Sequence, residues 1–461
     1  MIIAILGVMK AGGAYVPLGV DHPRARLERV LSLTNAKLLL YGSGQHTARI
    51  TDLEETFPSL QVALVALDQS FIDSDISSDV LPSVNGSHLA YVLFTSGSTG
   101  GVGVEHHNLS ALFRSGQADA ATHPGMRKLL LSPYTFDISV GDIFSALTTG
   151  NTLVLVQRER MLSNLFFWLE KTRTTHLSIT STLARHLPTD GIPFLKYINF
   201  IGETVPIDVA SRLSGNRNLR NTMGPTECVV SATEYIIPPH STTASFGERV
   251  PIGCPIGSTN IYILRPSTYD LVAIGEVGEI CIGGSQVSRG YVTDAALSEA
   301  KFVPDPFSNV VGARMFHSGD LGRWNRNKLV EHLGRMDRQI KLRGLRVETG
   351  EIETVVQNAS EDISSVYVDM HEVEGEQLLI ALIVLAFDAI VEQEEESDSR
   401  TVHVLDATQE SVKVAVKKGK EACEKLLPVY MKPAVWHCIS SLPRDSNGKL
   451  DHRVLQDLIQ G

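Results

Sequence analysis

A run of small polar residues and glycines, Thr95 to Gly101, directly follows the apolar stretch Leu89 to Phe94. The apolar stretch is typical of a buried strand. Glycines let a backbone come close to an anion, and successive N–H groups and hydroxyls can bind phosphate oxygens. A Ser/Thr/Gly surface turn is the alternative. Because the run contains no lysine, it is not a Walker A motif, and we predict a nucleotide-phosphate loop of another kind.

Length, composition and charge narrow the classes of protein to which the chain can belong. A chain of 461 residues predicts about two to four structural units. The residues are 43% hydrophobic and 20% charged, as in ordinary globular domains. The net charge of −11 argues against nucleic acid as the main partner. The five cysteines show neither metal-site spacing nor a disulfide framework, which favours a reducing, cytoplasmic compartment.

The apolar N-terminus, Met1 to Lys10, does not have the sequence of a signal peptide. It lacks a basic leading segment, and a Gly-Gly-Ala-Tyr-Val-Pro stretch follows where a cleavage site would lie. No run in the chain reaches the ~20 apolar residues that a membrane span requires, so we expect no membrane partner. The helix expected at Ile2 to Met9 has no capping residue before it, which indicates that part of the N-terminal fold is missing.

Apolar strands that alternate with helical stretches dominate the chain before Ile252. Such strands predict parallel sheets that are covered on both faces. From Ile252 on, short strands and glycine turns predict an antiparallel, barrel-like unit, and a small α+β domain is expected after Asp337. An acidic run at 392–399 is expected to be a solvated loop. We expect strands at 36–41, 129–131, 152–156, 176–179, 197–201, 260–264, 278–282, 328–332, 365–370 and 377–384, and helices at 2–9, 25–33, 349–359 and 410–426.

Nine short motifs occur in order along the chain, at 10–18, 95–100, 136–139, 223–227, 278–284, 317–321, 334–353, 427–431 and 447–451. Among them are Phe-Asp-Ile-Ser, Met-Gly-Pro-Thr-Glu, His-Ser-Gly-Asp-Leu and Asn-Gly-Lys-Leu-Asp. In these motifs the chain resembles the adenylate-forming (ANL) enzymes, most closely the adenylation domains of fungal-type nonribosomal peptide synthetases. The resemblance implies an α/β fold with a core domain at 1–336, whose barrel-like part is 252–336, and a mobile C-terminal α+β domain at 337–461.

The resemblance implies a ligase that activates an α-amino acid with ATP and Mg²⁺. The product is an aminoacyl-adenylate, and pyrophosphate is released. The acyl group then passes to a phosphopantetheine thiol on a separate carrier domain. The expected partners are therefore peptidyl carrier and condensation domains outside this chain. The resemblance also implies a role in secondary metabolism and a cytoplasmic location. No carrier-type Gly-Gly-x-Ser motif follows within the chain.

The adenylation step brings two anions together, so it requires positive charge and positioning more than acid–base catalysis. Lys449 matches the family's catalytic lysine, because an ammonium on a flexible stem can bridge carboxylate and phosphate oxygens. Glu227 matches the Mg²⁺ ligand, a hard oxygen for a hard cation, and Thr226 matches a phosphate contact. The alternatives are a surface lysine and a surface carboxylate. The other nucleotide-binding residues implied are Thr95, Ser96, Gly97, Ser98, Thr99, Gly100, Gly202, Glu203, Thr204, Asn221, Asp320 and Arg335.

Asp137 is the most informative residue for the substrate, since in peptide synthetases the aspartate of this motif pairs with the substrate α-ammonium. The alternative is a helix-capping aspartate. The resemblance places the remaining pocket walls at Ile138, Gly141, Ser178, Asn199, Ile201, Thr222, Val230 and Ser231. Gly141 indicates a deep pocket, with room for a large or aromatic side chain. Ser178 and Asn199 indicate some polar character at depth.

Asp337 matches the family's hinge, about which the C-terminal domain swings between the two half-reactions. Adenylation would bring in Lys449, and thioester formation would present Lys341 to Arg346, with Gly344 giving the thiol a path. Three departures stand out. The loop lacks the family's x-Pro-Lys segment after Gly100, only nine residues precede the motif that begins at Lys10, and Met223 replaces the usual tyrosine.

Two other functions fit parts of the sequence. An acyl- or aryl-CoA ligase would share the fold, but Asp137 and the Asn-Gly-Lys-Leu-Asp tail disfavour it. An inactive domain that serves as a scaffold is favoured by the short loop and the missing N-terminal part. The presence of Glu227, Asp320 and Lys449 opposes that interpretation, so we expect an adenylating enzyme whose rate the short loop and truncation reduce.

Overall fold

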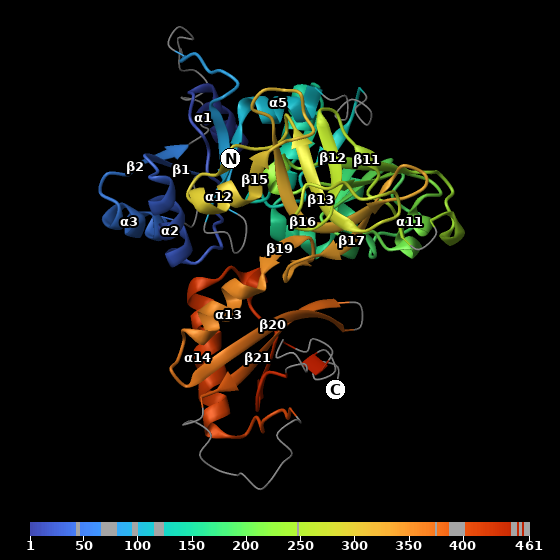
Figure 1. Cartoon of the computed structure of the whole chain (residues 1–461). Helices are drawn as coiled ribbons and strands as arrows, with labels where there is room; N and C mark the ends of the chain where they lie inside the picture. Colours follow the sequence, from blue (N-terminus) through green and yellow to red (C-terminus); the bar gives the residue numbers. More distant parts are fainter. Residues whose placement is uncertain are drawn as a thin grey trace. The chain divides into compact units, whose positions relative to one another are not determined.

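The chain is described by a computed structural model at residues 1–42, 47–65, 81–94, 100–114, 124–246, 249–373, 376–386, 402–443, 450 and 454–455. It divides into two compact units (Figure 1). Unit 1 comprises Met1–Gly19, Ala36–Ile50 and Phe57–Asp337, and unit 2 comprises Val20–Asn35, Thr51–Thr56 and Arg338–Gly461. The main boundary thus falls directly after Asp337. Unit 2 also contains two N-terminal segments, which the sequence had led us to place in the first domain.

A seven-stranded sheet forms the centre of unit 1, with the strand order β11-β10-β9-β8-β7-β5-β6. Strands β6, β5, β7, β8 and β9 are parallel, which confirms the expected parallel sheet, whereas β10 and β11 are antiparallel additions at one edge. The strands are β5 (Arg127–Leu129), β6 (Thr152–Val154), β7 (His176–Ile179), β8 (Tyr197–Ile201), β9 (Asn218–Met223), β10 (Thr233–Ile237) and β11 (Cys254–Pro255).

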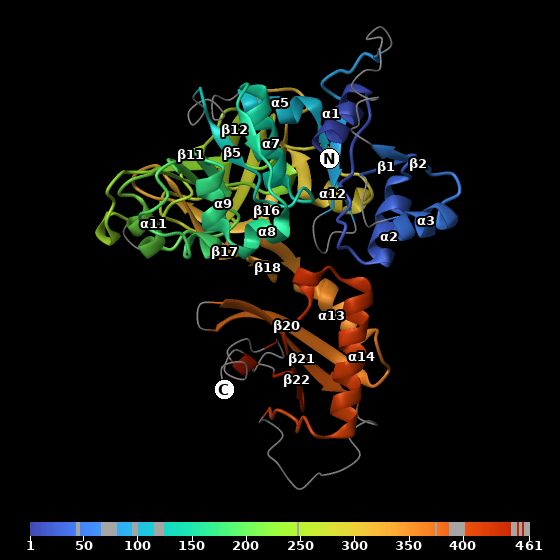
Figure 2. The same ribbon diagram turned by 180° about the vertical axis from the view of Figure 1, so that it is seen from behind.

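Successive side chains of these strands point to opposite faces of the sheet. Leu177, Ile198, Phe200 and Leu219 are buried in one apolar core. The residues between them, such as Ser178 and Asn199, belong to the other face, where α7 (Asp137–Thr148) packs near β5 and β6 (Figure 2). One face of the sheet is therefore mainly apolar, and the other carries the polar side chains that form the site.

Unit 1 also contains two antiparallel sheets. The expected barrel-like unit is a five-stranded sheet, in which β17 joins the path β12-β13-β16-β15 by pairing with β16. Its strands are β12 (Thr259–Leu264), β13 (Gly278–Gly284), β15 (Phe302–Pro304), β16 (Arg314–Trp324) and β17 (Val330–Arg335). The smaller sheet has the order β14-β4-β3, with β3 (Leu89–Leu93), β4 (Val102–Glu105) and β14 (Gly290–Tyr291).

The strand expected at 36–41 exists, but it is not buried as predicted. Strand β1 (Leu38–Gly42) pairs only with β2 (Gln61–Val65), and its two end residues are exposed. A two-stranded sheet lacks neighbours that could cover it, so an apolar run here overstated the burial. The helices and turns of the first 301 residues are α1 (Ile2–Lys10), α2 (Arg24–Thr34), α3 (Thr47–Thr56), α5 (His106–Arg114), α8 (Arg158–Ser163), α9 (Leu165–Lys171), α10 (Ser181–Ala184), α11 (Ile207–Leu213), η2 (Thr226–Cys228), η3 (Thr243–Ser245) and α12 (Ala295–Lys301).

Unit 2 is the small α+β part. Its three-stranded sheet has the order β20-β21-β22, with β20 (Ile363–Val373), β21 (Glu376–Leu385) and β22 (Val435–Ile439), and it packs with α13 (Thr349–Gln357) and α14 (Glu410–Leu426) around one apolar core. The helix predicted at 410–426 is confirmed. A hairpin, β18 (Gln339–Leu342) and β19 (Leu345–Glu348), and a turn, η5 (Val429–Met431), complete the unit. No helix in the described part of the chain is long and apolar enough to span a membrane.

Candidate active site

A cavity of about 120 Å³ lies between α7 and the polar face of strands β7, β8 and β9. From α7 it is lined by Ile138, Gly141, Asp142 and Ser145. This i, i+3, i+4, i+7 spacing places the four residues on one stripe of the helix. The strands contribute mainly the residues of one face, and Ser178 and Asn199 are neighbours in register. Helical and strand periodicity together therefore build the cavity.

The cavity brings together residues that are far apart in the sequence. All eight walls implied by the resemblance line it, namely Ile138, Gly141, Ser178, Asn199, Ile201, Thr222, Val230 and Ser231. Asp137 is the first residue of α7, immediately before Ile138. The N-cap of this helix is Phe136, and Asp137 is the acidic residue of its first turn. The assigned role of Asp137 stays a prediction.

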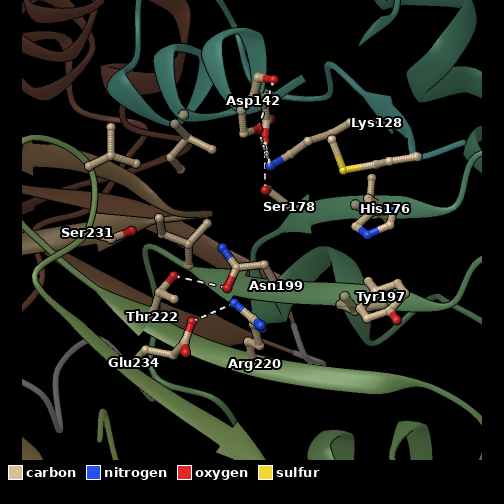
Figure 3. Close-up of a pocket in the computed structure, with 18 of the residues that line it drawn as sticks. Lys128, Asp142, His176, Ser178, Tyr197, Asn199, Arg220, Thr222, Ser231 and Glu234 are labelled. Atoms are coloured by element: carbon tan, nitrogen blue, oxygen red, sulfur yellow. Dashed lines mark hydrogen bonds and ion pairs between the residues drawn. The ribbon is translucent and has the colours of Figure 1, made fainter. Parts of the chain in front are cut away.

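A buried ion pair lies at the α7 side of the cavity (Figure 3). Lys128 Nζ is 3.1 Å from Asp142 Oδ1 and also donates to Ser145 Oγ at 3.1 Å. Ser178 Oγ donates to the same Asp142 oxygen at 2.7 Å. Burial raises the pKa of Asp142, and the Lys128 charge opposes that shift. Burial alone favours the neutral form of the Asp142 carboxyl, and the charge of Lys128 favours the ionised form.

A second pair lies on the sheet side. Arg220 Nη1 is 2.7 Å from Glu234 Oε2, and Thr222 Oγ1 donates to Asn199 Oδ1 at 3.1 Å. Burial raises the pKa of Glu234, partly offset by Arg220. In Figure 3 these four side chains lie on the strands opposite Lys128 and Asp142. The described lining of the cavity thus holds Lys, Arg, Asp and Glu side chains in two matched pairs.

The turn that follows η2 is strained where it meets the cavity. Val229 and Val230 have φ angles of 56° and 67°, a region that β-branched residues rarely adopt. A Cβ atom on Gly141 would lie 3.1 Å from Val230 Cγ1, and one on Gly224 would lie 2.6 Å from Ser231 Cα. Val230 therefore lies against Gly141 at the cavity wall, and the depth that we inferred from Gly141 stays a prediction.

The nucleotide side is organised around Glu227, which is completely buried. Tyr291 donates its hydroxyl to Glu227 Oε1 at 2.7 Å. A Cβ on Gly100 would lie 2.6 Å from Tyr291 Cβ, so glycine is required where the predicted loop ends against β14. Thr226 begins η2 beside Glu227. Thr95, Ser96, Gly97, Ser98 and Thr99 lie outside the described residues.

Strand β4 begins directly after the glycine run. Gly103 belongs to β4, and Gly101 directly precedes the first residue of that strand. Gly101 donates its N–H to Thr293 Oγ1 at 3.2 Å, and a Cβ on it would lie 2.6 Å from Val92 Cγ1. A Cβ on Gly103 would lie 2.4 Å from Val292 Cγ1. These two glycines are therefore explained by close packing between β3, β4 and β14.

A second cluster joins Asp320, Arg335 and Asp337, as the resemblance implied for the first two. Asp320 is 4% exposed, and its Oδ1 accepts from Arg335 Nη1 at 3.0 Å and from His332 Nε2 at 3.1 Å. Arg335 also holds both oxygens of Asp337, at 2.6 and 2.7 Å. One guanidinium therefore connects the residue expected at the ribose with the residue expected at the hinge.

The side chains expected beside the adenine are engaged within the fold. The Glu203 carboxylate accepts from Ser181 Oγ at 2.9 Å and from the Thr182 N–H at 2.8 Å. Asn221 donates its amide to the Pro251 carbonyl at 2.7 Å. Gly202 has a φ of 89°, and Thr204 accepts through its carbonyl from Ser181 Oγ. These contacts engage the side chains of Glu203 and Asn221 and hold the ends of β8 and β9. Any contact with an adenine base would therefore come from backbone atoms or from neighbouring residues.

Glu279, Cys281 and His317 form a group on neighbouring strands β13 and β16, whose ligand atoms lie within 4.8 Å of one another. Glu279 Oε2 accepts from His317 Nδ1 at 2.9 Å, and Oε1 accepts from the Gly319 N–H at 3.0 Å. Burial alone raises the pKa of Glu279, but these hydrogen bonds outweigh it and bring the pKa below its usual range. The group holds the turn that leads into Asp320.

Of Lys449 and Gly344, to which the resemblance assigned roles, only Gly344 is among the described residues. Lys449 lies outside the described residues, and so does the acidic run at 392–399. Gly344 and Arg343, with φ angles of 79° and 51°, form the turn of the β18–β19 hairpin. Two positive φ angles are the mark of a tight hairpin turn, which accounts for the glycine.

Sequence reasoning missed both charged pairs of the cavity. Asp142 could have been found, because it lies four residues after Ile138 on the same helical stripe. Arg220 could have been found from its two-residue spacing to Thr222 on β9. Lys128 and Glu234 gave no signal, since each becomes a cavity residue only through the pairing of β5 and β10 with their neighbours.

Residues 1–292 match the family model described as AMP-binding enzyme. The chain belongs to this family, which confirms the resemblance to adenylate-forming enzymes.

The chain is similar to much longer proteins. It is 39% identical over 477 residues to the nonribosomal peptide synthetase agiA of Aspergillus flavus, and 32% identical over 460 residues to bacitracin synthase 3 of Bacillus licheniformis. The alignments cover 100% and 99% of this chain but only 6% and 7% of those proteins. The chain thus spans only a small fraction of the length of these relatives.

Solved structures show the same fold. One is PA1221, a protein with adenylation and carrier domains, at a TM-score of 0.79 and 21% identity, covering 99% of this chain and 73% of that one. Another is the Vibrio cholerae adenylation domain AlmE in complex with glycyl-adenosine-5'-phosphate, at a TM-score of 0.78 and 22% identity, covering 100% and 86%.

Proposed function

We propose that the chain activates an α-amino acid as its aminoacyl-adenylate and then transfers the acyl group to a carrier-bound phosphopantetheine thiol. One observation carries the proposal: eight pocket residues, drawn from one helix, three strands and a turn, line a single cavity. The amino acid carboxylate would attack the α-phosphate of ATP, forming a carboxylate–phosphorus bond while pyrophosphate leaves. Peptide synthetase relatives support an amino acid over a fatty or aryl acid.

Residues of this chain would supply binding and positioning. Asp137 would pair with the α-ammonium at the start of α7, which leaves the side chain to enter the cavity. Asp320, held by Arg335, would accept from the ribose hydroxyls, because a carboxylate is an acceptor only. Thr226 and the loop 95–100 would contact the phosphates, and Gly202, Glu203, Thr204 and Asn221 would border the adenine.

Mg²⁺ fits the donor chemistry at Glu227. The carboxylate is a hard oxygen ligand, and Tyr291 fixes the orientation of its Oε1. When bound, Mg²⁺ would neutralise phosphate charge. Phosphopantetheine would come from a carrier domain, and carrier and condensation domains would be the partners, as in proteins that combine adenylation and carrier domains. The reaction would take place in the cytoplasm, where ATP and amino acids are available.

Amino-acid-dependent ATP–pyrophosphate exchange tests the proposal. We expect exchange with a narrow set of amino acids, measured as label incorporated into ATP. Absence of exchange with every amino acid, in protein shown to be folded by circular dichroism, would contradict it and favour the scaffold interpretation. Thioester formation on coenzyme A in place of a carrier would favour the CoA ligase.

Lys449 gives a sharper test of the two half-reactions. We expect Lys449→Ala to reduce exchange by roughly 10²-fold or more, as when a group that stabilises transition-state charge is removed. Thiolation from preformed adenylate should be largely retained. Lys432→Ala, at a lysine that precedes the last strand of unit 2, serves as the control. An equal loss of both half-reactions would refute the role assigned to Lys449.

A further inference from the structure

The Asp142 carboxylate, which lines the cavity, is only half satisfied. Its Oδ1 accepts two hydrogen bonds, from Ser178 and Lys128. Its Oδ2 has no hydrogen-bond partner among the described residues, and the residue is 1% exposed. A buried acceptor that is left without a donor costs about 1–3 kcal/mol. A ligand group that donates a hydrogen bond to this carboxylate would remove that cost.

The donor must be electrically neutral. Lys128 already compensates the charge of Asp142 at 3.1 Å, and Arg220 compensates Glu234 at 2.7 Å. A cationic side chain would therefore add an unmatched charge to a buried space, which is strongly unfavourable. An anionic side chain would meet two carboxylates whose cations are already paired. A hydroxyl, phenol, indole or carboxamide meets the requirement.

The position of Asp142 also sets the length of the side chain. Asp142 follows Asp137 by five residues on α7, which corresponds to about 7.5 Å along the helix axis. A substrate whose ammonium is held at Asp137 must therefore extend over several bonds. Ile138, Ile201 and Val230 also line the cavity, so we expect the middle of that side chain to be apolar.

We propose that the pocket selects an α-amino acid whose long, mainly apolar side chain ends in a neutral hydrogen-bond donor, and that Asp142 is the specificity-determining residue that accepts from it. This inference depends on the proposed function for the position of the ammonium group. It adds Asp142, with Lys128 as its positioning residue, to the walls that the resemblance implied. Lys128 acts through its charge, which favours the ionised carboxylate, and through its contact with Oδ1, which orients that carboxylate.

Matched pairs of amino acids test the proposal in the full chain. Each pair differs in the terminal donor: tyrosine and phenylalanine, tryptophan and 3-benzothienylalanine, and glutamine and glutamate γ-methyl ester. We expect the donor-bearing member of the activated pair to have a kcat/KM in ATP–pyrophosphate exchange about 100-fold or more above its partner, because a site built around a polar contact rejects analogues that lack it. In Asp142→Asn the acceptor is exchanged for an amide, and the ratio should fall below about 10-fold.

Binding without ATP separates this inference from the proposed function. Calorimetric titration of the same pairs into the wild-type chain and Asp142→Asn reports the donor preference even if no exchange occurs, in which case only the proposed reaction fails. Asp305→Asn is the control, because Asp305 is a similarly buried aspartate outside the cavity whose partners are Tyr262 and the Phe307 N–H.

Several outcomes would overturn the inference. One is a wild-type preference for the members that lack a donor, which decides the question even if Asp142→Asn does not fold. Another is a ratio that Asp142→Asn leaves unchanged. A third is failure of the wild-type chain both to bind and to activate all three donor-bearing members.

Discussion

The cavity beside α7 and the Asp320 cluster both pair a buried aspartate with a basic residue, but the surroundings of the two pairs differ. In the cavity, Lys128 and Asp142 are 17% and 1% exposed at their side chains, and both belong to elements packed inside unit 1. In the Asp320 cluster, Arg335 joins Asp320, which is 6% exposed at its side chain, to Asp337, which is 46% exposed. One pair is enclosed, and the other extends to an exposed residue at the C-terminal end of unit 1.

This difference indicates what each region can do. A pair enclosed between a helix and a sheet cannot rearrange without leaving a charge buried, so it suits selection of a fixed substrate shape. A pair with one exposed partner can open at little cost, because water replaces the lost contact. Arg335 is therefore suited to a place where a hinge must move, while its contact with Asp320 remains in position.

The largest effect is expected at the enclosed pair. Lys128→Met leaves the Asp142 charge buried without its cation, so the free energy of unfolding should fall by about 3–5 kcal/mol. Urea denaturation measures the loss. The double variant Lys128→Met/Asp142→Leu should recover most of it, because it removes both charges.

A surface pair of the same unit provides the control for this prediction. Arg265 and Glu276 are 3.7 Å apart and 60% and 49% exposed, so Arg265→Met should leave the urea midpoint unchanged. If Lys128→Met were as stable as Arg265→Met, burial would not make the Lys128–Asp142 pair more important for stability than an exposed pair.

The next effect is expected at the turn that carries Asp320. Glu279 accepts from His317 and from the Gly319 N–H, so Glu279→Gln should lower the free energy of unfolding by about 1–3 kcal/mol near neutral pH. The pKa of Glu279 lies below the ordinary 4.5, so its ionised form stabilises the fold above that pH, and the contribution is lost as pH falls below it. The gap between variant and wild type should therefore close on acidification.

Thermal unfolding from pH 7 to pH 3 checks this expectation. Glu331 provides the comparison, since the pKa of this half-buried glutamate is also lowered, by hydrogen bonds from Asn325 and Arg323 that outweigh burial, but it lies away from the Asp320 turn. Glu331→Gln should show the same pH trend without weakening nucleotide binding. A Glu279→Gln deficit that grows on acidification would contradict the assignment.

The two regions also differ in how far the sequence predicted them. The parallel strands at 176–179 and 197–201 were found at their observed ends, because each is a short segment whose apolar residues are buried in the sheet. The pocket walls followed from a resemblance and meet in space. The strain at Val229 and Val230 could not be predicted, since β-branched residues ordinarily avoid positive φ angles and only the surrounding packing imposes them.

The glycines after Gly100 show why local patterns can mislead. A Ser/Thr/Gly run predicts a loop, but Gly101 and Gly103 owe their lack of a side chain to Val92 on β3 and to Val292 directly after β14. Val292 is distant in the sequence, so no local pattern contains it. The same limit applies to the Lys128–Asp142 pair, which depends on how β5 and α7 pack.

The smallest effect on stability is expected at the exposed end of the second cluster. Asp337→Ala removes a partner that is 46% exposed, so the free energy of unfolding should change by less than about 1 kcal/mol. Asp320→Ala, at the buried end of the same Arg335 side chain, is the matched comparison and should weaken ATP binding strongly, because it leaves Arg335 and His332 without their common acceptor. If Asp337 is the hinge, its variant should retain pyrophosphate exchange and slow thioester formation on a carrier domain. If the two variants changed exchange equally, the assignment of Asp320 as a nucleotide contact and of Asp337 as a hinge residue would be contradicted.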